Sequence, residues 1–137
     1  PGSGLASLTR RKLTHFGIDF NIAEEIEVIT LDHLTKKLNL RPHMLKIDVE
    51  GHELDVLKGS IETLPHLKVV QFEFGGCNID TRTFFQDFWY LLKDLDFDVY
   101  RISKYGPIPI STYSEDDECF VTSNFVAVKV SNKSESA

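Results

Sequence analysis

The side chains best suited to chemistry lie between residues 44 and 53. This stretch reads MLKIDVEGHE, so that Lys46, Asp48 and Glu50 alternate with aliphatic residues. Such alternation predicts a strand with one apolar face and one charged face. His52 follows directly, and imidazole titrates closer to neutral pH than other side chains do. A carboxylate or an imidazole in this place could remove a proton from a reacting group.

These side chains depend on a strand, a turn and a helix that follow one another. Gly51 permits a sharp bend after the strand, and apolar residues recur at helical spacing from Leu54 onward. A second strand is expected over residues 67–74, and it ends with Glu73 and a glycine pair. Two strands joined through a helix form a parallel, right-handed crossover. We therefore expect Glu73 to emerge at the same sheet edge as Asp48.

Ligands of open parallel sheets bind beyond the carboxyl ends of the strands. Asp48 and Glu73 would line such a crevice, and Asn78 in the following turn could orient a hydroxyl through its amide. A structural interpretation is also open, in which Lys46 pairs with Asp48 or Glu50 on the surface. In that interpretation the other carboxylates and the amide cap helices. Spacing alone does not decide between the two.

The rest of the chain predicts further strands and helices. Thr30 is expected to cap a helix that carries Asp32 in its first turn, where a carboxylate favours the helix dipole. Farther along, Trp89 and Tyr90 lie in a stretch with aromatic residues at helical spacing, which indicates core packing. The expected elements are a strand at 26–29, helices at 31–38 and 81–95, strands at 97–103 and 125–130, a long connection between those two strands, and a frayed tail at 131–137.

Composition indicates one soluble domain over residues 1–137. The chain is 42% hydrophobic and 26% charged, which suits a single core. Its formal net charge of -6 argues against a nucleic-acid partner, and no apolar run is long enough to span a bilayer. We expect a cytoplasmic protein without nucleic-acid or membrane partners, in which the charged runs at 10–12 and 115–118 face solvent.

The two cysteines, Cys77 and Cys119, lack the spacing of metal ligands and are expected to be reduced thiols. A nucleophilic Cys77 would need a nearby cation, and none follows it before Arg82. Thiol catalysis is therefore disfavoured, and no metal site is expected.

Several separated blocks together resemble a known family. The ordered pattern LD at 31–32, KIDVEGHE at 46–53, VLKG at 56–59 and FE at 72–73 is similar to the carboxyl-terminal half of the FkbM family of S-adenosylmethionine-dependent methyltransferases. The resemblance implies an α/β fold, a partial Rossmann-like class I methyltransferase sheet that is mostly parallel, with an antiparallel last strand and helices on the faces. The family's glycine-rich cofactor turn has no counterpart in this sequence, which resembles a truncated homologue.

The resemblance also implies a reaction and roles for the residues named above. The reaction would be methyl transfer from S-adenosylmethionine to a hydroxyl of a sugar or another small natural product. Asp48 is the first candidate for the base and His52 the second, while Asp48 and Lys46 would meet the cofactor. Acceptor binding would fall to Glu50, Glu73 and Asn78.

Two other classes of function stay open. A non-catalytic binding module would use its open sheet edge to pair with a second copy or with a partner chain. A magnesium-dependent hydrolase or phosphoryl-transfer enzyme would hold the ion with Asp48, Glu50 and Glu73. No phosphate-cradling turn accompanies those three carboxylates.

Overall fold

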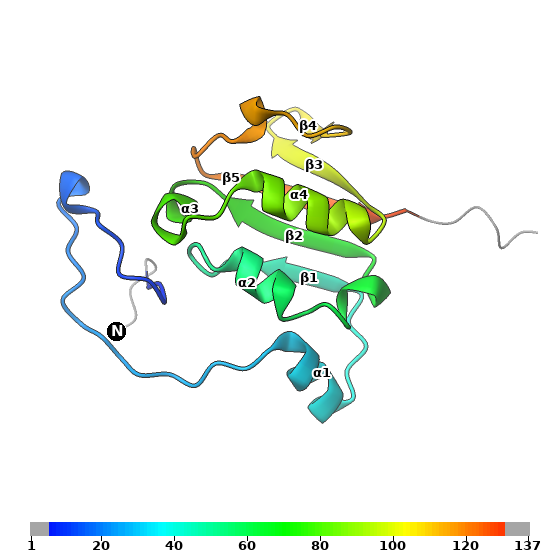
Figure 1. Cartoon of the computed structure of the whole chain (residues 1–137), viewed down its shortest axis with the longest axis horizontal. Coiled ribbons are helices and arrows are strands. Elements are labelled where there is room, and N and C mark those ends of the chain that lie inside the picture. The colour runs from blue at the N-terminus through cyan, green and yellow to red at the C-terminus, as the bar shows by residue number, and fades with distance from the viewer. Residues whose placement is uncertain (1–5, 131–137) are drawn as a thin grey trace, which may run out of the picture.

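The computed structural model describes residues 6–130, and the expected tail at 131–137 lies outside that range. One sheet of five strands forms the centre, in the order β1-β2-β5-β3-β4 (Figure 1). The strands are β1 (Met44–Ile47), β2 (Val69–Phe74), β3 (Phe97–Ser103), β4 (Gly106–Pro109) and β5 (Ser123–Lys129). The helices are α1 (Leu31–Leu38), α2 (Glu53–Lys58), α3 (Gly76–Thr81) and α4 (Phe85–Asp94), with short 3-10 turns at Thr14–Phe16, Leu64–His66 and Glu115–Asp117.

The sheet is mixed, and the expectation of a mostly parallel sheet is wrong. Only β1 and β2 pair in parallel, with Ile47 opposite Phe72. The last strand, β5, is antiparallel as expected, but it lies between β2 and β3 and runs opposite to both. The hairpin partner β4 adds another antiparallel pair. Because β2 and β3 are both antiparallel to β5, they run in the same direction as each other. β1, β2 and β3 therefore still have their carboxyl ends at one edge of the sheet.

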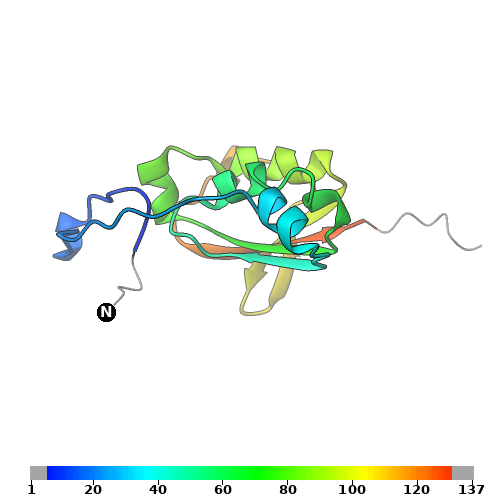
Figure 2. The ribbon, with the colours of Figure 1, turned by 90° about the horizontal axis from the view of Figure 1, so that it is seen from below.

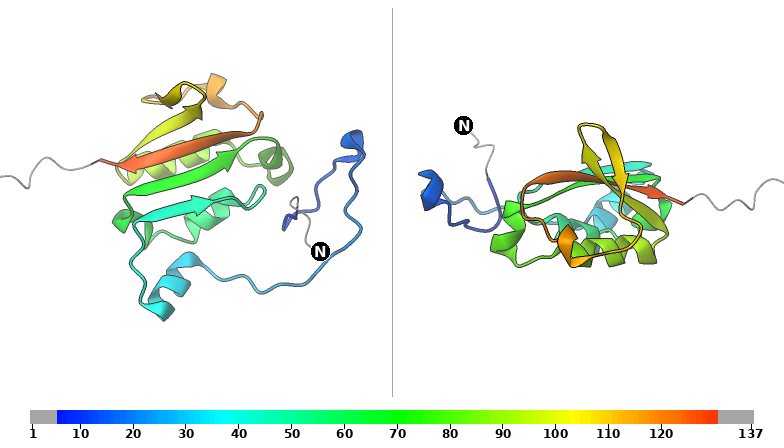
Figure 3. Two further views of the ribbon diagram at one scale, coloured as in Figure 1. Left: turned by 180° about the vertical axis from the view of Figure 1, so that it is seen from behind. Right: turned by 90° about the horizontal axis from the view of Figure 1, so that it is seen from above.

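The helices cover one face of the sheet and not both, contrary to expectation. In Figures 2 and 3 α1, α2 and α4 lie on the same side, and in the described part of the chain no helix covers the other face. The alternation along β2 follows this layering: Val70, Phe72 and Phe74 are buried, whereas Val69 and Glu73 are partly exposed. We call the side without helices the uncovered face.

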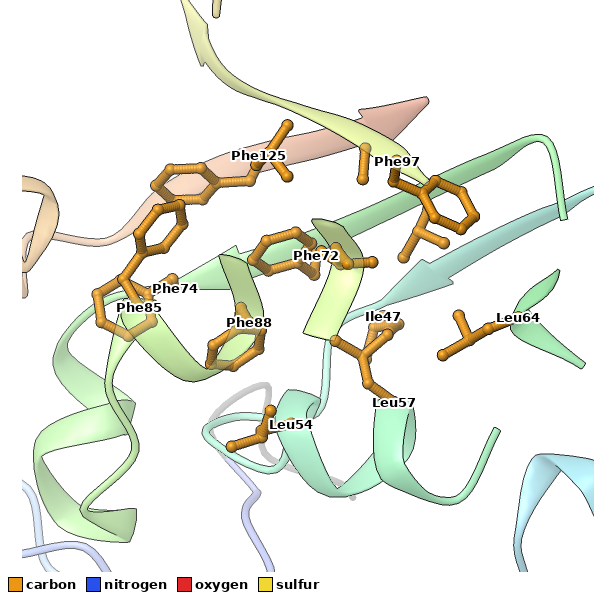
Figure 4. Close-up of a cluster of buried hydrophobic side chains, with 14 of the residues drawn as sticks. Ile47, Leu54, Leu57, Leu64, Phe72, Phe74, Phe85, Phe88, Phe97 and Phe125 are labelled. Atoms are coloured by element: carbon orange, nitrogen blue, oxygen red, sulfur yellow. The ribbon is translucent and has the colours of Figure 1, made fainter. Parts of the chain in front are cut away.

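Aromatic side chains dominate the core between the sheet and α4 (Figure 4). The ring of Phe72 stacks on Phe88 with 5.1 Å between centroids and on Phe125 with 5.5 Å. Phe74 meets Phe85 edge to face at 5.5 Å. These rings bury large apolar areas, and each well-placed aromatic pair adds about 1 kcal/mol. The helical spacing of aromatic residues therefore marked the core correctly for Phe85 and Phe88. The expectation of core packing is wrong for Tyr90, which is 49% exposed, whereas Trp89 is partly buried against the core.

The helix expected over 81–95 is shorter and has a separate helix before it. α3 ends at Thr81, and the next residue, Arg82, adopts the left-handed conformation with a φ of 57°. The α4 helix then begins at Phe85, where the carboxylate of Glu118 accepts hydrogen bonds from the backbone N–H groups of Phe85 and Gln86 at 2.8 and 2.9 Å. This cap comes from the run at 115–118, so the expectation that the whole run faces solvent is wrong for Glu118.

Two further expectations need correction. Residues 26–29 form no strand; all residues from 21 to 30 are exposed and unpaired with the sheet. The connection between β3 and β5 contains β4 and the 3-10 turn Glu115–Asp117. By contrast, the helix at Leu31–Leu38 is confirmed, with the hydroxyl of Thr30 accepting a hydrogen bond from the N–H of His33.

Candidate functional site

Two carboxylates come together where β1 and β2 end, at the left edge of the sheet in Figure 1. Asp48 follows the last residue of β1, and Glu73 is the next-to-last residue of β2. Burial raises the pKa of Glu73, and the negative charge of Asp48 raises it further. The parallel pairing of the two strands therefore produces the convergence that their order in the sequence indicated.

Lys46 lies beside these carboxylates on the uncovered face. Its Nζ is 3.3 Å from Oδ2 of Asp48, and both side chains are more than half exposed. In the strand register Lys46 is opposite Gln71, which lies two residues before Glu73 and on the same face of β2. An exposed pair of this kind contributes little to stability, so both groups are available to a ligand.

The turn between β1 and α2 is fixed by buried groups. Glu53 is only 2% exposed, and its carboxylate accepts hydrogen bonds from the N–H groups of Val49 at 3.1 Å and Gly51 at 3.0 Å. Gly51 has a φ of +104°, and a Cβ there would lie 3.0 Å from the carbonyl oxygen of Cys77. Glu53 therefore shapes the turn, and glycine is needed because α3 packs directly against it.

His52 is held at both ring nitrogens. Its Nδ1 lies 2.8 Å from Oδ2 of Asp55, and its Nε2 lies 2.9 Å from Oγ1 of Thr9. A carboxylate on Nδ1 fixes the orientation and the tautomer of an imidazole. The hydroxyl of Thr9 thus stands where a reacting hydroxyl could meet Nε2. Sequence reasoning identified His52 but missed both of its partners.

Glu50 lies in a half-buried cluster with residues from distant parts of the chain. Its Oε2 accepts hydrogen bonds from Nη1 of Arg11 at 3.2 Å and from Sγ of Cys77 at 3.1 Å. The Nε of Arg11 also donates to Asp80 at 3.0 Å. The side chain of Arg11 is 10% exposed, so the expected solvation of the 10–12 run is wrong for this residue.

The charges in this cluster set the protonation of its members. Burial alone would lower the pKa of Arg11, but the hydrogen bond to Asp80 and the surrounding negative charges raise it. Burial raises the pKa of Cys77 to about 12, with a further contribution from the hydrogen bond to Glu50. Cys77 is therefore a neutral thiol at physiological pH, which fits a structural role better than a nucleophilic one.

Asn78 is 1% exposed and lies inside the turn that begins α3. Its Oδ1 accepts a hydrogen bond from the N–H of Gly75 at 2.8 Å, and its Nδ2 donates to Oγ1 of Thr83 at 2.8 Å. These contacts correspond to the capping interpretation of Asn78. Its role toward an acceptor stays a prediction.

The segment from residue 6 to residue 13, which we call the N-terminal arm, lies against the turn. The hydroxyl of Ser7 donates to the carbonyl oxygen of Glu50 at 2.9 Å, and Thr9 and Arg11 make the contacts described above. The arm thus reaches the groups that sequence reasoning assigned to chemistry. The structure brings Lys46, Asp48 and Glu73 together on the uncovered face, and it places Glu50 and His52 beneath the arm.

Between residues 6 and 130, no three His, Cys, Asp or Glu side chains are grouped closely enough to hold a metal ion. Within the same range, every helix is too short or too polar to cross a bilayer.

Comparison with known proteins identifies the family. The family model described as "Methyltransferase FkbM domain" matches residues 3–99, well over half of the chain. The match includes the strand, turn and helix that carry Asp48 and His52, and it also includes Glu73 in β2. No curated protein and no solved structure matches the chain at a significant level. The chain belongs to the FkbM methyltransferase domain family.

Proposed function

We propose that this chain serves the transfer of a methyl group from S-adenosylmethionine to a hydroxyl of a sugar or another small natural product. Membership of the family supports methyl transfer in general. The observation that carries the choice of a hydroxyl acceptor is the arrangement of His52, whose Nε2 lies 2.9 Å from a hydroxyl while Asp55 holds Nδ1. Deprotonation of an alcohol as the new bond forms requires a base in this geometry.

Asp48 and Lys46 are exposed at the sheet edge and are the groups we assign to the cofactor. Two hollows of the described surface lie elsewhere, beside β3 and β4, and the sequence has no G-x-G-x-x-G turn after a strand. Asp48 and Lys46 therefore account for contacts with only one side of the cofactor. When bound, S-adenosylmethionine supplies an electrophilic methyl group.

In this proposal His52 takes the proton of the acceptor. The acceptor hydroxyl replaces the Thr9 hydroxyl at Nε2, which accepts the proton, and Asp55 stabilises the resulting imidazolium. Asp48, the first candidate from the sequence, is more than half exposed and 3.3 Å from Lys46, which favours a contact with the cationic cofactor. Glu73 and Glu50 are assigned to orienting the acceptor.

The strand directions support the Rossmann-like part of the proposal. β1, β2 and β3 share one direction, and the antiparallel β5 lies between β2 and β3. This arrangement corresponds to one side of a doubly wound sheet, in which ligands bind at the carboxyl ends of the strands. The assigned residues lie at that edge.

The test combines calorimetry with a methyl-transfer assay on the full chain. Wild type should bind S-adenosylhomocysteine saturably, and Asp48→Asn should weaken that binding. His52→Gln should leave binding intact and lower transfer about 100-fold or more, because general-base catalysis is worth that much. Asp98→Asn removes an equal charge from the amino end of β3, where Asp98 pairs with Lys93, and should change neither readout.

Other results would contradict the proposal. No binding by wild type would remove direct cofactor use by this chain. Binding with full transfer by His52→Gln would remove the base assigned here, and loss of transfer in Asp48→Asn with unchanged affinity would transfer that role to Asp48.

A second candidate function is a binding module, and the edges of the sheet favour it. β1 is an edge strand without proline, and its Met44 is 54% exposed. The opposite edge strand, β4, contains Pro107 and Pro109, which block pairing. A second copy or a partner chain would therefore add to β1. Sedimentation equilibrium separates the alternatives: a dimer that binds no cofactor favours the module.

A magnesium-dependent hydrolase receives no comparable support. Asp48 pairs with Lys46, and Glu50 pairs with Arg11. In residues 6–130 these carboxylates form no group suited to a metal ion.

A further inference from the structure

A hollow of about 200 Å³ lies at the base of the β3–β4 hairpin, away from the site described above. It is lined by Arg101 of β3, by Ile108 and Pro109 of β4, and by Ser111, Thr112 and Asp117 of the connection to β5. Arg101 is opposite Phe125 in the register, so it lies on the helix-covered side of the sheet. The hairpin itself projects from the uncovered side (Figure 2).

Arg101 has buried donors that the described part of the chain does not satisfy. Its Nε and Nη2 are shielded from solvent and have no hydrogen-bond partner among residues 6–130. The nearest carboxylate oxygen is Oδ1 of Asp117, 3.8 Å from Nη2, which is beyond hydrogen-bonding distance. A guanidinium cannot lose its charge, and unpaired buried donors cost free energy. The position therefore favours an added acceptor.

The surroundings hold the guanidinium in a defined orientation. Its Cζ lies 5.4 Å from the centroid of the Phe125 ring, and Phe125 is buried in the core. Asp117 is fixed in turn, because its Oδ2 accepts a hydrogen bond from the N–H of Ser114 at 3.0 Å. The hollow is thus bordered by a partly exposed guanidinium and an anchored carboxylate at a set separation.

The remaining lining adds hydroxyl groups. Ser111 and Thr112 are exposed beside Arg101. A planar guanidinium suits an oxyanion with two oxygens, whereas Asp117 needs a hydrogen-bond donor and repels a plain anion. A ligand that satisfies both groups carries an anionic group next to a donor.

From this arrangement we infer that the hollow binds a small polar ligand in which a carboxylate or phosphate lies beside a hydroxyl or amino group. Arg101 pairs with the oxyanion, and Asp117 accepts a hydrogen bond from the neighbouring donor. The inference concerns a site separate from the one assigned to methyl transfer, and it does not depend on that assignment.

The test is an NMR titration of the full ¹⁵N-labelled chain with acetate, glycolate and inorganic phosphate, at constant ionic strength maintained with chloride. Saturable shifts are expected at the amides of Ser111, Thr112 and Asp117. Glycolate should bind several-fold more tightly than acetate, because its hydroxyl meets Asp117. Saturation by phosphate but not by glycolate would identify a phosphate ligand, and the reverse would identify a hydroxy acid; either supports the site.

Two variants of Arg101 test its role. Arg101→Lys keeps the charge but loses the fork, and it should weaken binding about tenfold or more. Arg101→Gln should abolish it. Shifts that persist unchanged in both variants, or that chloride reproduces in wild type, would overturn the inference.

Asp117→Asn provides a readout that does not depend on altering the stacked arginine. Removal of the carboxylate should tighten acetate binding and reduce the advantage of glycolate. If the ranking of acetate and glycolate is the same as in wild type, Asp117 does not select the ligand and the inference fails.

Discussion

The charges at the ends of β1 and β2 repel each other, and Glu73 shows the effect. Its pKa is raised, first by burial and then by the charge of Asp48. A carboxyl whose folded pKa lies above its unfolded pKa favours the folded state at low pH, and that stabilisation is lost as the pH rises through the folded pKa. At neutral pH the ionised Glu73 therefore reduces stability.

Glu73→Gln should accordingly stabilise the protein at neutral pH by about 0.5 kcal/mol, the usual size of an exposed charge interaction. Urea denaturation measures the change, and the difference should vanish at a pH below the unfolded pKa. Asp98→Asn is the control, because it breaks the 2.9 Å pair with Lys93 and should not stabilise. Destabilisation by Glu73→Gln at neutral pH would show that the carboxylate makes a favourable contact.

The two thiols should differ in reactivity. Cys77 has a pKa of about 12 because burial and the hydrogen bond to Glu50 disfavour the thiolate, whereas Cys119 is exposed. Alkylation by iodoacetamide, followed by mass spectrometry, should therefore modify Cys119 at least about tenfold faster. Glu50→Gln should speed the reaction of Cys77. Equal rates in wild type would contradict the raised pKa of this partly buried thiol.

Residue-scale chemistry was only partly predictable from the sequence. The convergence of Asp48 and Glu73 follows from two strands joined by a helix, which is a local pattern. The ion pair of Arg11 with Asp80 joins residues 69 positions apart, and no periodicity indicates such a contact. Glu53 belongs to the charged stretch, yet it is buried as a backbone acceptor, because a turn with two positive φ values leaves N–H groups to satisfy.

At the scale of elements, one carboxylate of α1 makes three hydrogen bonds to the segment that follows α2. Oδ1 of Asp32 accepts hydrogen bonds from the N–H and the hydroxyl of Thr63 at 2.8 and 2.6 Å, and Oδ2 accepts from the N–H of Glu62 at 3.0 Å. Burial alone would raise the pKa of Asp32, but these hydrogen bonds outweigh it and lower the pKa. Asp32 therefore does more than favour the dipole of its own helix.

Asp32→Asn should lower the free energy of unfolding at neutral pH by about 1–2 kcal/mol, because hydrogen bonds to a charged group contribute about 1.5–3 kcal/mol and the partial exposure of Asp32 reduces this. A lowered folded pKa contributes stability above the unfolded pKa, and this contribution is lost as the pH falls through the folded pKa. Thermal or urea unfolding across an acid pH series should show the two proteins converging. Asp94→Asn, an exposed charge-matched control on α4, should not reproduce this dependence.

Elements with strong local signals were predicted well, and those that depend on distant groups were not. The alternation in β1, the Thr30 cap and the apolar spacing in α4 are all local. The strand expected at 26–29 has the right alternation, but within the described chain no neighbouring strand pairs with it. The beginning of α4 depends on Glu118, which lies 33 residues away from Phe85 and therefore carries no sequence signal.

Across the whole molecule, protection of the backbone should be uneven. β2 lies between β1 and β5 and contributes Phe72 and Phe74 to the core, whereas residues 21–30 are all exposed. Amides exchange slowly where hydrogen bonds are buried and rapidly where they face solvent.

Hydrogen-exchange mass spectrometry should therefore show residues 21–29 at near-intrinsic exchange rates and β2 as the slowest segment. A dilution series is the control. If a second copy bound to the β1 edge, the protection of residues 21–29 would depend on protein concentration. Strong, concentration-independent protection of residues 21–29 would contradict the arrangement described here.

The mostly parallel sheet was the largest error at this scale, and it has a physical cause. Strand direction can be inferred from a connecting helix, as between β1 and β2, but the position of β5 depends on long-range pairing. The strand that comes last in sequence inserts between β2 and β3, which makes both of its pairings antiparallel. The helices of the described residues all lie on one side of the sheet (Figures 2 and 3), and the side on which a helix packs likewise depends on long-range contacts.

Trp89 has a practical consequence for experiments on this protein. It is the single tryptophan of the chain, and its Nε1 donates to the carbonyl oxygen of Ile110 at 3.0 Å. Ile110 in turn belongs to the lining of the hollow at Arg101. The indole emission spectrum therefore reports on that lining without a label, so ligand screening there needs only a fluorimeter and unmodified protein.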